Sequence, residues 1–83
     1  MYFVYILKSV KSPWLHYVGR TQNLKRRLKE HNQKRERCYS KHNAPWKVET
    51  YIAFENEKMA QSFELYLKSG SGHAFLKRRL FTA

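Results

Sequence analysis

The spacing of hydrophobic and polar positions changes along the chain, and each spacing predicts a different element. Residues 2–7 (YFVYIL) form a short run of aromatic and β-branched side chains, which is typical of a buried central strand. After a Lys/Ser-rich turn with Pro13, residues 14–19 (WLHYVG) are expected to pair with this strand and to end at Gly19. The N-terminal segment therefore predicts a β-hairpin.

A basic helix and a loop are expected next. Leu24 and Leu28 form an apolar seam in a helix that runs to about His31, and Thr21 or Asn23 can cap it by accepting hydrogen bonds from its free N–H groups. Residues 32–45 mix charges with Asn and Pro and show no apolar period, which indicates an exposed loop rather than a linker between domains.

A two-residue period returns from Trp46 to Phe54, which predicts a third strand with one strongly buried face. From Asn56 the apolar positions recur three and four apart, as in an amphipathic helix that ends near Gly70. Ser71 is then expected to cap a short terminal helix. Its inward-facing residues would be Phe75, Leu76 and Leu80.

The composition fits one small domain. The chain has 83 residues, and its six Tyr, five Phe and two Trp provide enough bulky apolar area to fill two layers, a short sheet and a few helices. Cys38 stands alone, so the fold needs no internal disulfide, and an ordinary loop thiol in a reducing cytoplasm is expected.

The charge predicts an anionic partner. Lys and Arg number 17 against 6 Asp and Glu, for a formal charge of +11. No apolar run approaches the ~18 residues of a spanning helix, and the N-terminus lacks the pattern of a signal peptide. We therefore expect nucleic acid rather than a membrane as the partner, and a cytoplasmic location.

Arg27 and His31 lie four residues apart at the edge of the first helix's apolar seam. Arg27 must pass close to the sheet, where its guanidinium could grip a phosphate with two hydrogen bonds, and His31 could orient a phosphate or a water. The alternative is a solvated basic face, with His31 placed favourably at the C-terminal end of the helix dipole.

Glu64 is the single acid among apolar neighbours in the second helix, at the border of its buried face. It could bind a hard divalent ion such as Mg²⁺, which commonly keeps several waters and needs one or two protein carboxylates. The alternative is a salt bridge with one of the many basic residues. The four histidines show no zinc-ligand spacing with a second Cys, which argues against a zinc site.

Tyr5 and Tyr17 lie on the two strands of the predicted hairpin, so their phenols could meet on one sheet face. A phenol there, its pKa lowered from ~10 by nearby cations, could accept a proton from an attacking water. The alternative is the ordinary packing of tyrosines in a strand.

The order of these segments resembles that of the GIY-YIG nuclease superfamily over nearly the whole chain. VYI at residues 4–6 overlaps the first motif, with Phe3 in place of its glycine, and YVG at residues 17–19 matches the second. NLKRRLKEHN, APWKVE and SFELYLKSGSG follow. Either tripeptide alone would be weak evidence, but the series of segments is specific.

The resemblance implies an α/β fold of the α+β type, with a three-stranded antiparallel sheet flanked by about three helices in a single domain over residues 1–83. It also implies cleavage of DNA phosphodiesters with Mg²⁺ or Mn²⁺. By position, the implied catalytic residues are Tyr5, Tyr17, Arg27, His31 and Glu64, with Glu64 as the metal ligand and Gly19 as the motif glycine. Residues expected to contact nucleic acid are Arg20, Lys25, Arg26, Lys29 and Lys41.

In the mechanism we expect, Tyr5 deprotonates the attacking water, which Tyr17 orients, and Arg27 stabilises the phosphate. One alternative is a noncatalytic nucleic-acid-binding module on the same fold, and another is an RNA or ribosome partner. Charge alone cannot separate these, but only an enzyme needs Glu64, Tyr5 and Arg27 together. We therefore expect an endonuclease, in DNA repair or recombination by family analogy, with a protein partner or a second copy of the chain for targeting.

Overall fold

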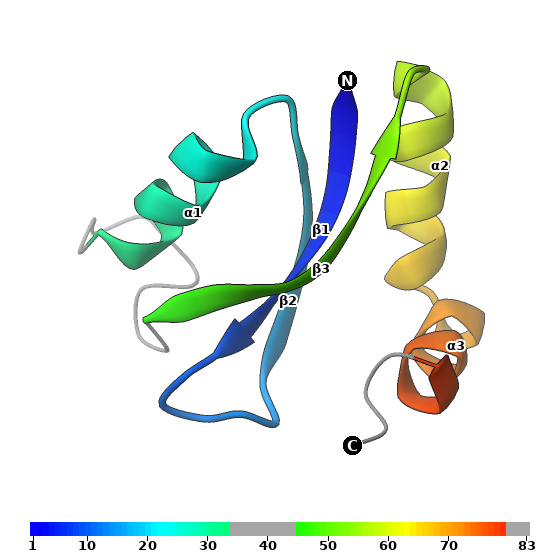
Figure 1. Ribbon diagram of the computed structural model, residues 1–83. Coiled ribbons are helices and arrows are strands. Elements are labelled where there is room, and N and C mark those ends of the chain that lie inside the picture. The colour runs from blue at the N-terminus through cyan, green and yellow to red at the C-terminus, as the bar shows by residue number, and fades with distance from the viewer. Residues whose placement is uncertain (34–44, 80–83) are drawn as a thin grey trace.

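A computed structural model describes residues 1–33 and 45–79 (Figure 1). The elements among these residues are β1 (Tyr2–Ser9), β2 (His16–Thr21), α1 (Leu24–Asn32), β3 (Trp46–Phe54), α2 (Glu57–Leu67) and α3 (Gly70–Arg79). The strands form an antiparallel sheet in the order β2-β1-β3. This confirms the predicted three-stranded antiparallel sheet with three helices. Most of the predicted loop at 32–45, with Cys38 and Lys41, lies outside the described residues, as does Leu80.

Helices cover both faces of the sheet, so the fold has three layers and not the two expected (Figure 1). Successive side chains of a strand point to opposite faces. Tyr5 and Leu7 of the central strand β1 therefore belong to a core cluster on the α1 side. Val4 and Ile6 belong to a second cluster on the side of α2 and α3. Because both of its faces are covered, β1 is apolar throughout.

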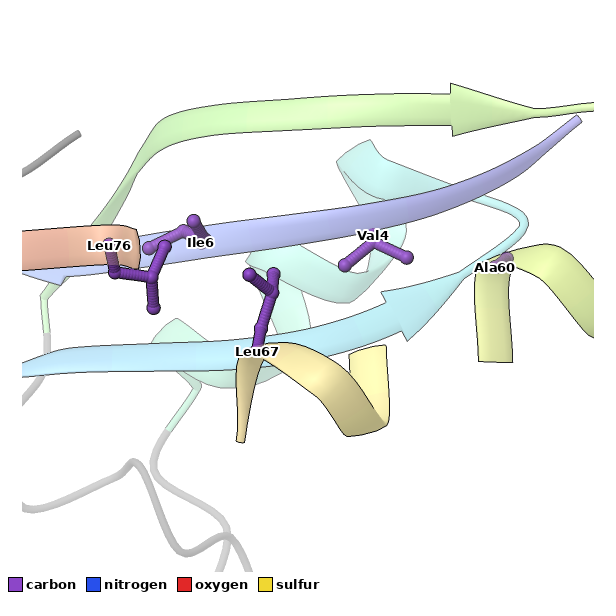
Figure 2. Packing of buried hydrophobic residues seen from close by; sticks show 5 residues of the cluster. All are labelled: Val4, Ile6, Ala60, Leu67 and Leu76. Carbon is purple, nitrogen blue, oxygen red and sulfur yellow. The ribbon is translucent and has the colours of Figure 1, made fainter. Parts of the chain in front are cut away.

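Figure 2 shows the second cluster, in which the side chains of Leu67 and Leu76 lie against β1. Leu67 comes from the end of α2 and Leu76 from α3, so the two helices share one core. Gly72 permits their close approach, since a Cβ at this position would lie 2.5 Å from the Cα of Leu67.

The predicted bounds of β2 are wrong at both ends. The turn after β1 extends to Leu15, whose carbonyl accepts a hydrogen bond from the Ser9 N–H at 3.1 Å, and Trp14 is 75% exposed. The strand begins at His16 and continues past Gly19, which pairs with Tyr5 inside the ladder. Gly19 is therefore a residue of the strand and not its end.

Asn23 is the N-cap of α1, and its side-chain Oδ1 accepts a hydrogen bond from the Arg26 N–H at 3.0 Å. Thr21, the other candidate, supports this cap by accepting from the Asn23 N–H at 3.1 Å. In α3, the Ser69 hydroxyl accepts from the Gly72 N–H at 3.2 Å. Ser69 thus takes the capping role that the sequence assigned to Ser71, because α3 begins earlier, at Gly70.

The prediction that β3 has one buried face is also wrong. Ile6 pairs with Thr50 but Leu7 pairs with Val48, so Glu49 is an extra residue in a β-bulge. The bulge exchanges the faces of the strand: Val48 packs in the α1 cluster, and Phe54 packs in the cluster on the other side. The apolar residues that alternate along β3 therefore lie on one face of the sheet before the bulge and on the other face after it.

Candidate active site

β1 and β2 bring the two predicted tyrosines together. Tyr5 pairs with Gly19 and Leu7 with Tyr17, and the ring centroids of Tyr5 and Tyr17 are 6.4 Å apart. The Tyr5 phenol lies directly against Gly19, where a Cβ would be 2.6 Å from the Tyr5 Cζ and even closer to its hydroxyl oxygen. A residue without a side chain is therefore needed at position 19 to leave the phenol in this place.

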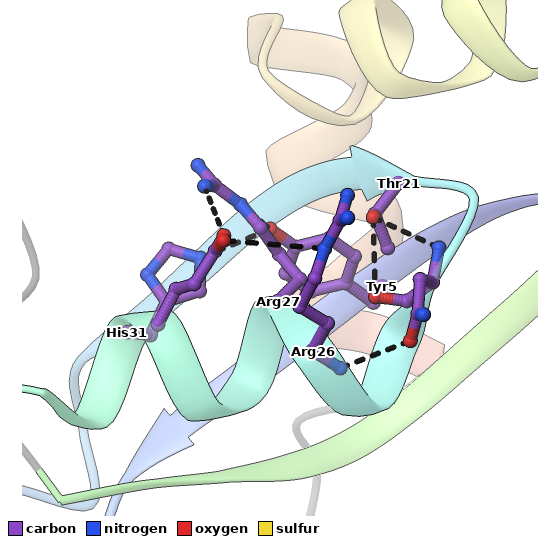
Figure 3. A network of polar contacts seen from close by, with 7 residues as sticks. Tyr5, Thr21, Arg26, Arg27 and His31 are labelled. Atoms are coloured by element: carbon purple, nitrogen blue, oxygen red, sulfur yellow. Dashed lines mark hydrogen bonds and ion pairs between the residues drawn. The ribbon is translucent and has the colours of Figure 1, made fainter.

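Two side chains of α1 meet at the Tyr5 hydroxyl oxygen (Figure 3). Arg27 Nε donates a hydrogen bond to Tyr5 Oη at 3.3 Å, and His31 Nε2 lies 3.0 Å from the same oxygen. Their spacing of four residues places both on one side of the helix. Leu24 and Leu28 of the same helix pack against the cluster that contains Tyr5, which fixes α1 over the sheet.

The electrostatics of Tyr5 differ from the expectation. Burial raises the pKa of Tyr5 to about 12, and the hydrogen bond and charge of Arg27 lower it by less than burial raises it. Nearby Tyr17 and Glu64 add to the rise. The predicted lowering of the Tyr5 pKa is therefore wrong, because Tyr5 is only 1% exposed and desolvation penalises its phenolate.

His31 is buried beneath the same group, with 2% of its surface exposed. Burial lowers the pKa of its imidazole, the Arg27 charge lowers it further, and Glu30 opposes the shift. The ring of Tyr17 packs against it, with 4.6 Å between centroids. At neutral pH, a protonated phenol thus faces a neutral imidazole, which is a matched donor and acceptor pair.

Glu64 reaches the same region from α2, and its charge acts on the pKa of Tyr5. Its side chain is 15% exposed and makes two ion pairs, with Oε1 3.4 Å from Arg20 Nε and Oε2 accepting from Lys68 Nζ at 3.0 Å. The salt-bridge alternative for this residue is therefore present. Arg20 Nη1 is buried and has no hydrogen-bond partner within residues 1–33 and 45–79.

Glu64 supplies one carboxylate toward a hard divalent ion whose other ligands would be water and the substrate. Within the described part of the chain, no group of three or more His, Cys, Asp or Glu side chains could hold a metal. One carboxylate is enough for Mg²⁺ or Mn²⁺ when water and phosphate oxygens complete the coordination, but a metal at Glu64 would compete with Arg20 and Lys68 for its two oxygens. Glu64 therefore fits the metal that the resemblance implies.

The other basic residues predicted to contact nucleic acid form the outer side of α1, where Lys25, Arg26 and Lys29 are exposed. Arg20 points instead toward Glu64, and Lys41 lies outside the described residues. Two partners of the site residues, Glu30 and Lys68, were not predicted from the sequence. Glu30 accepts from Arg27 Nη1 at 3.0 Å, and Lys68 binds Glu64. Their spacings of three and four residues within helices are the signal that could have found them.

Comparison with known proteins gives the family of the chain. The family model for the GIY-YIG catalytic domain matches residues 1–78. The chain belongs to the GIY-YIG family. It is also similar to the UPF0213 protein CPE1444 of Clostridium perfringens (strain 13 / Type A), at 43% identity over 68 residues. The match covers 82% of this chain and 71% of that relative, whose name states no activity.

Membership of the GIY-YIG family indicates a nuclease, and a nuclease acts on nucleic acid. Nucleases of this family typically use a divalent metal. In the described residues, no helix has the length and apolar character needed to cross a membrane.

His31 should make the stability of this GIY-YIG domain depend on pH. Its folded-state pKa lies below the ordinary value, so the unfolded chain takes up a proton first as the pH falls. The free energy of unfolding should therefore decrease as the pH falls from about 6.5 through the folded-state pKa. Urea denaturation of the wild type and His31→Gln between about pH 8 and about pH 5 measures this. Equal slopes against pH for the two proteins would contradict it.

Proposed function

We propose that the protein is an endonuclease that hydrolyses DNA phosphodiester bonds with the help of Mg²⁺ or Mn²⁺. The observation that supports this best is the convergence of Arg27 and His31 on Tyr5 Oη, with the Glu64 charge acting on the same phenol. A module that only binds phosphates needs exposed cations and gives no reason for this buried phenol and imidazole. A role in DNA repair or recombination extends the proposal by family analogy.

In the proposed mechanism, Arg27 binds the scissile phosphate. Its side chain is 42% exposed and is held by Glu30, so the guanidinium is both oriented and open to a ligand. A guanidinium can donate two parallel hydrogen bonds to phosphate oxygens, and its charge stabilises the negative charge that builds up during the reaction. Because Arg27 also donates to Tyr5 Oη, a phosphate bound there lies next to the phenol.

Tyr5 and His31 act together on the proton of the attacking water. Tyr5 Oη accepts from Arg27 Nε, and the mechanism takes His31 as the tautomer with its proton on Nδ1, so that Tyr5 donates to Nε2 and keeps one lone pair for the water. As Tyr5 Oη takes the proton of the water, its own proton passes to His31 Nε2, and the hydroxide forms a bond to phosphorus. The bond between phosphorus and the leaving oxygen breaks, and that oxygen takes up a proton from solvent. Tyr5 never has to become a phenolate, so its raised pKa is compatible with this role, and Tyr17 holds the imidazole.

Glu64 would hold the divalent ion, which when bound supplies positive charge for a phosphate oxygen and the leaving oxygen. Arg20, Lys25, Arg26 and Lys29 contribute further phosphate contacts, and Lys41 is proposed from the sequence alone. These contacts make binding strongly dependent on salt, with a slope near ~0.9 per phosphate neutralised on duplex DNA.

Cleavage assays test this proposal. Labelled single-stranded, duplex, nicked and branched DNA, together with RNA, are incubated at low salt with the wild type and Mg²⁺, Mn²⁺ or EDTA. We expect DNA to be cut with either metal and to stay intact in EDTA. Tight binding without cutting on every substrate would contradict the enzyme and favour the noncatalytic binding module, whereas cutting of RNA alone would contradict the substrate.

A further inference from the structure

Both oxygens of the Glu64 carboxylate face a positive group. Arg20 Nε lies 3.4 Å from Oε1, and Lys68 Nζ lies 3.0 Å from Oε2. The Glu64 side chain is only 15% exposed, so little of the carboxylate is open to solvent. The two cations therefore occupy the oxygens that a metal would need. A divalent ion that approaches the free protein would be repelled by two charges and would have to displace at least one of them.

The two cations differ in how readily they can leave. Lys68 is 50% exposed and carries a compact charge on a flexible stem, so it can exchange Glu64 for water. Arg20 is 30% exposed and extends from β2, and its buried Nη1 has no hydrogen-bond acceptor among the described residues. Arg20 is therefore incompletely satisfied by Glu64 and lacks an acceptor of the kind that a phosphate oxygen provides.

Arg20 also lies near the position proposed for the substrate phosphate. It is ion-paired with Glu64, and the Glu64 charge acts on the pKa of Tyr5, to whose hydroxyl Arg27 donates. A phosphate next to Tyr5 and Arg27 thus offers Arg20 an anionic partner in place of Glu64. When Arg20 changes partner, the Glu64 carboxylate loses a cation and its affinity for a metal rises.

We propose that Arg20 and Lys68 lock Glu64 against divalent metal in the free protein, and that a nucleic-acid phosphate opens the lock by drawing Arg20 away. This inference rests on the proposed function, because it takes Glu64 as the metal ligand. Metal and nucleic acid then bind cooperatively, and each raises the affinity of the protein for the other by the same factor.

The test measures metal binding without any cleavage. Free Mn²⁺ is followed by electron paramagnetic resonance during titration of the wild type and of the double variant Arg20→Ala/Lys68→Ala, without nucleic acid. The double variant should bind Mn²⁺ at least about tenfold more tightly, within the usual range of coupling between sites. Lys68→Ala alone should give a smaller gain, and its exposed position keeps the core intact.

Two controls connect the gain to Glu64. Lys47→Ala/Lys58→Ala removes the same charge at two other exposed positions, in β3 and at the start of α2, and should bind Mn²⁺ like the wild type. Adding Glu64→Gln to Arg20→Ala/Lys68→Ala should abolish the gain. Equal Mn²⁺ affinity in the wild type, Lys68→Ala and the double variant would overturn the lock, as would a gain that persists with Glu64→Gln.

The coupling has a second readout. The affinity for a short fluorescein-labelled DNA is measured by anisotropy in EDTA and in Ca²⁺, another cation that takes oxygen ligands, at equal ionic strength. Ca²⁺ should raise the affinity of the wild type by at least about fivefold, and by less in Arg20→Ala/Lys68→Ala. If the protein cuts DNA but shows neither effect, the proposed function stands and the lock is contradicted. If it shows both effects but does not cut DNA, the lock stands and the proposed function is contradicted.

Discussion

Replacing Tyr5 by phenylalanine should lower the rate of DNA cleavage by roughly 10²–10⁴-fold, the usual contribution of a positioned acid or base. The change removes the oxygen on which Arg27 and His31 converge and leaves the ring in the core. DNA affinity should change little, because the phosphate-binding cations remain. Single-turnover cleavage and equilibrium binding on the same labelled DNA measure the two effects.

Tyr51→Phe is the matched control for this substitution, since it removes a phenol oxygen from a tyrosine of β3 that is 53% exposed. Tyr5→Phe also leaves buried His31 Nε2 without this partner, which costs about 1–3 kcal/mol of stability. The assays therefore need a temperature at which denaturation curves show both variants folded. Cleavage by Tyr5→Phe at the wild-type rate would contradict the proton path.

Replacing Glu64 by glutamine should reduce metal-dependent cleavage by about 10³-fold or more, because the substitution removes the carboxylate proposed to hold the ion. DNA affinity in EDTA should stay equal or increase slightly, since Arg20 and Lys68 lose the partner that competes with phosphate for them. Cleavage time courses at several Mn²⁺ concentrations, together with binding in EDTA, measure both expectations.

Glu55→Gln is the corresponding control, because Glu55 is exposed between β3 and α2. It should cleave like the wild type. If Glu64→Gln retained wild-type cleavage at every Mn²⁺ concentration, Glu64 would not be the metal ligand of the reaction. If Glu64→Gln lost DNA binding together with cleavage, the carboxylate would instead be needed to place Arg20 for substrate binding.

The fold was predictable from the sequence where the local pattern of apolar and polar residues matches the burial seen in the structure. The apolar run of β1 predicts a buried central strand, although not the third layer that covers its second face, and Asn23 and Asn56 are both recognisable helix starts. The sequence did not show which residues of β3 lie on which face of the sheet. The bulge at Glu49 arises from the pairing with β1 and does not interrupt the alternation of apolar and polar residues in β3. That alternation describes one strand, whereas register depends on two.

The candidate site was likewise predictable in part: its residues were, but their electrostatics were not. The resemblance pointed to Tyr5, Arg27 and Glu64, and the structure brings Arg27 into contact with Tyr5 and places Glu64 within electrostatic range of it. The direction of the Tyr5 pKa was not predictable. Neighbouring cations can be counted in a sequence, but desolvation depends on how completely three layers cover one phenol. The partners Glu30 and Lys68 were predictable, because Glu30 lies three residues after Arg27 and Lys68 four residues after Glu64.

Glu49 fixes the number of residues that β3 must contain. Without this residue, Trp46 and Val48 would each move by one position and turn toward the opposite layer. Asn32 at the end of α1 is hydrogen-bonded to the backbone N–H and carbonyl of Trp46, so that helix would lose its attachment along with its packing. A one-residue deletion in a strand at the edge of the sheet would therefore misalign the arginine of a helix elsewhere in the fold, which makes the length of β3 as much a requirement for the proposed activity as the side chains of the candidate site.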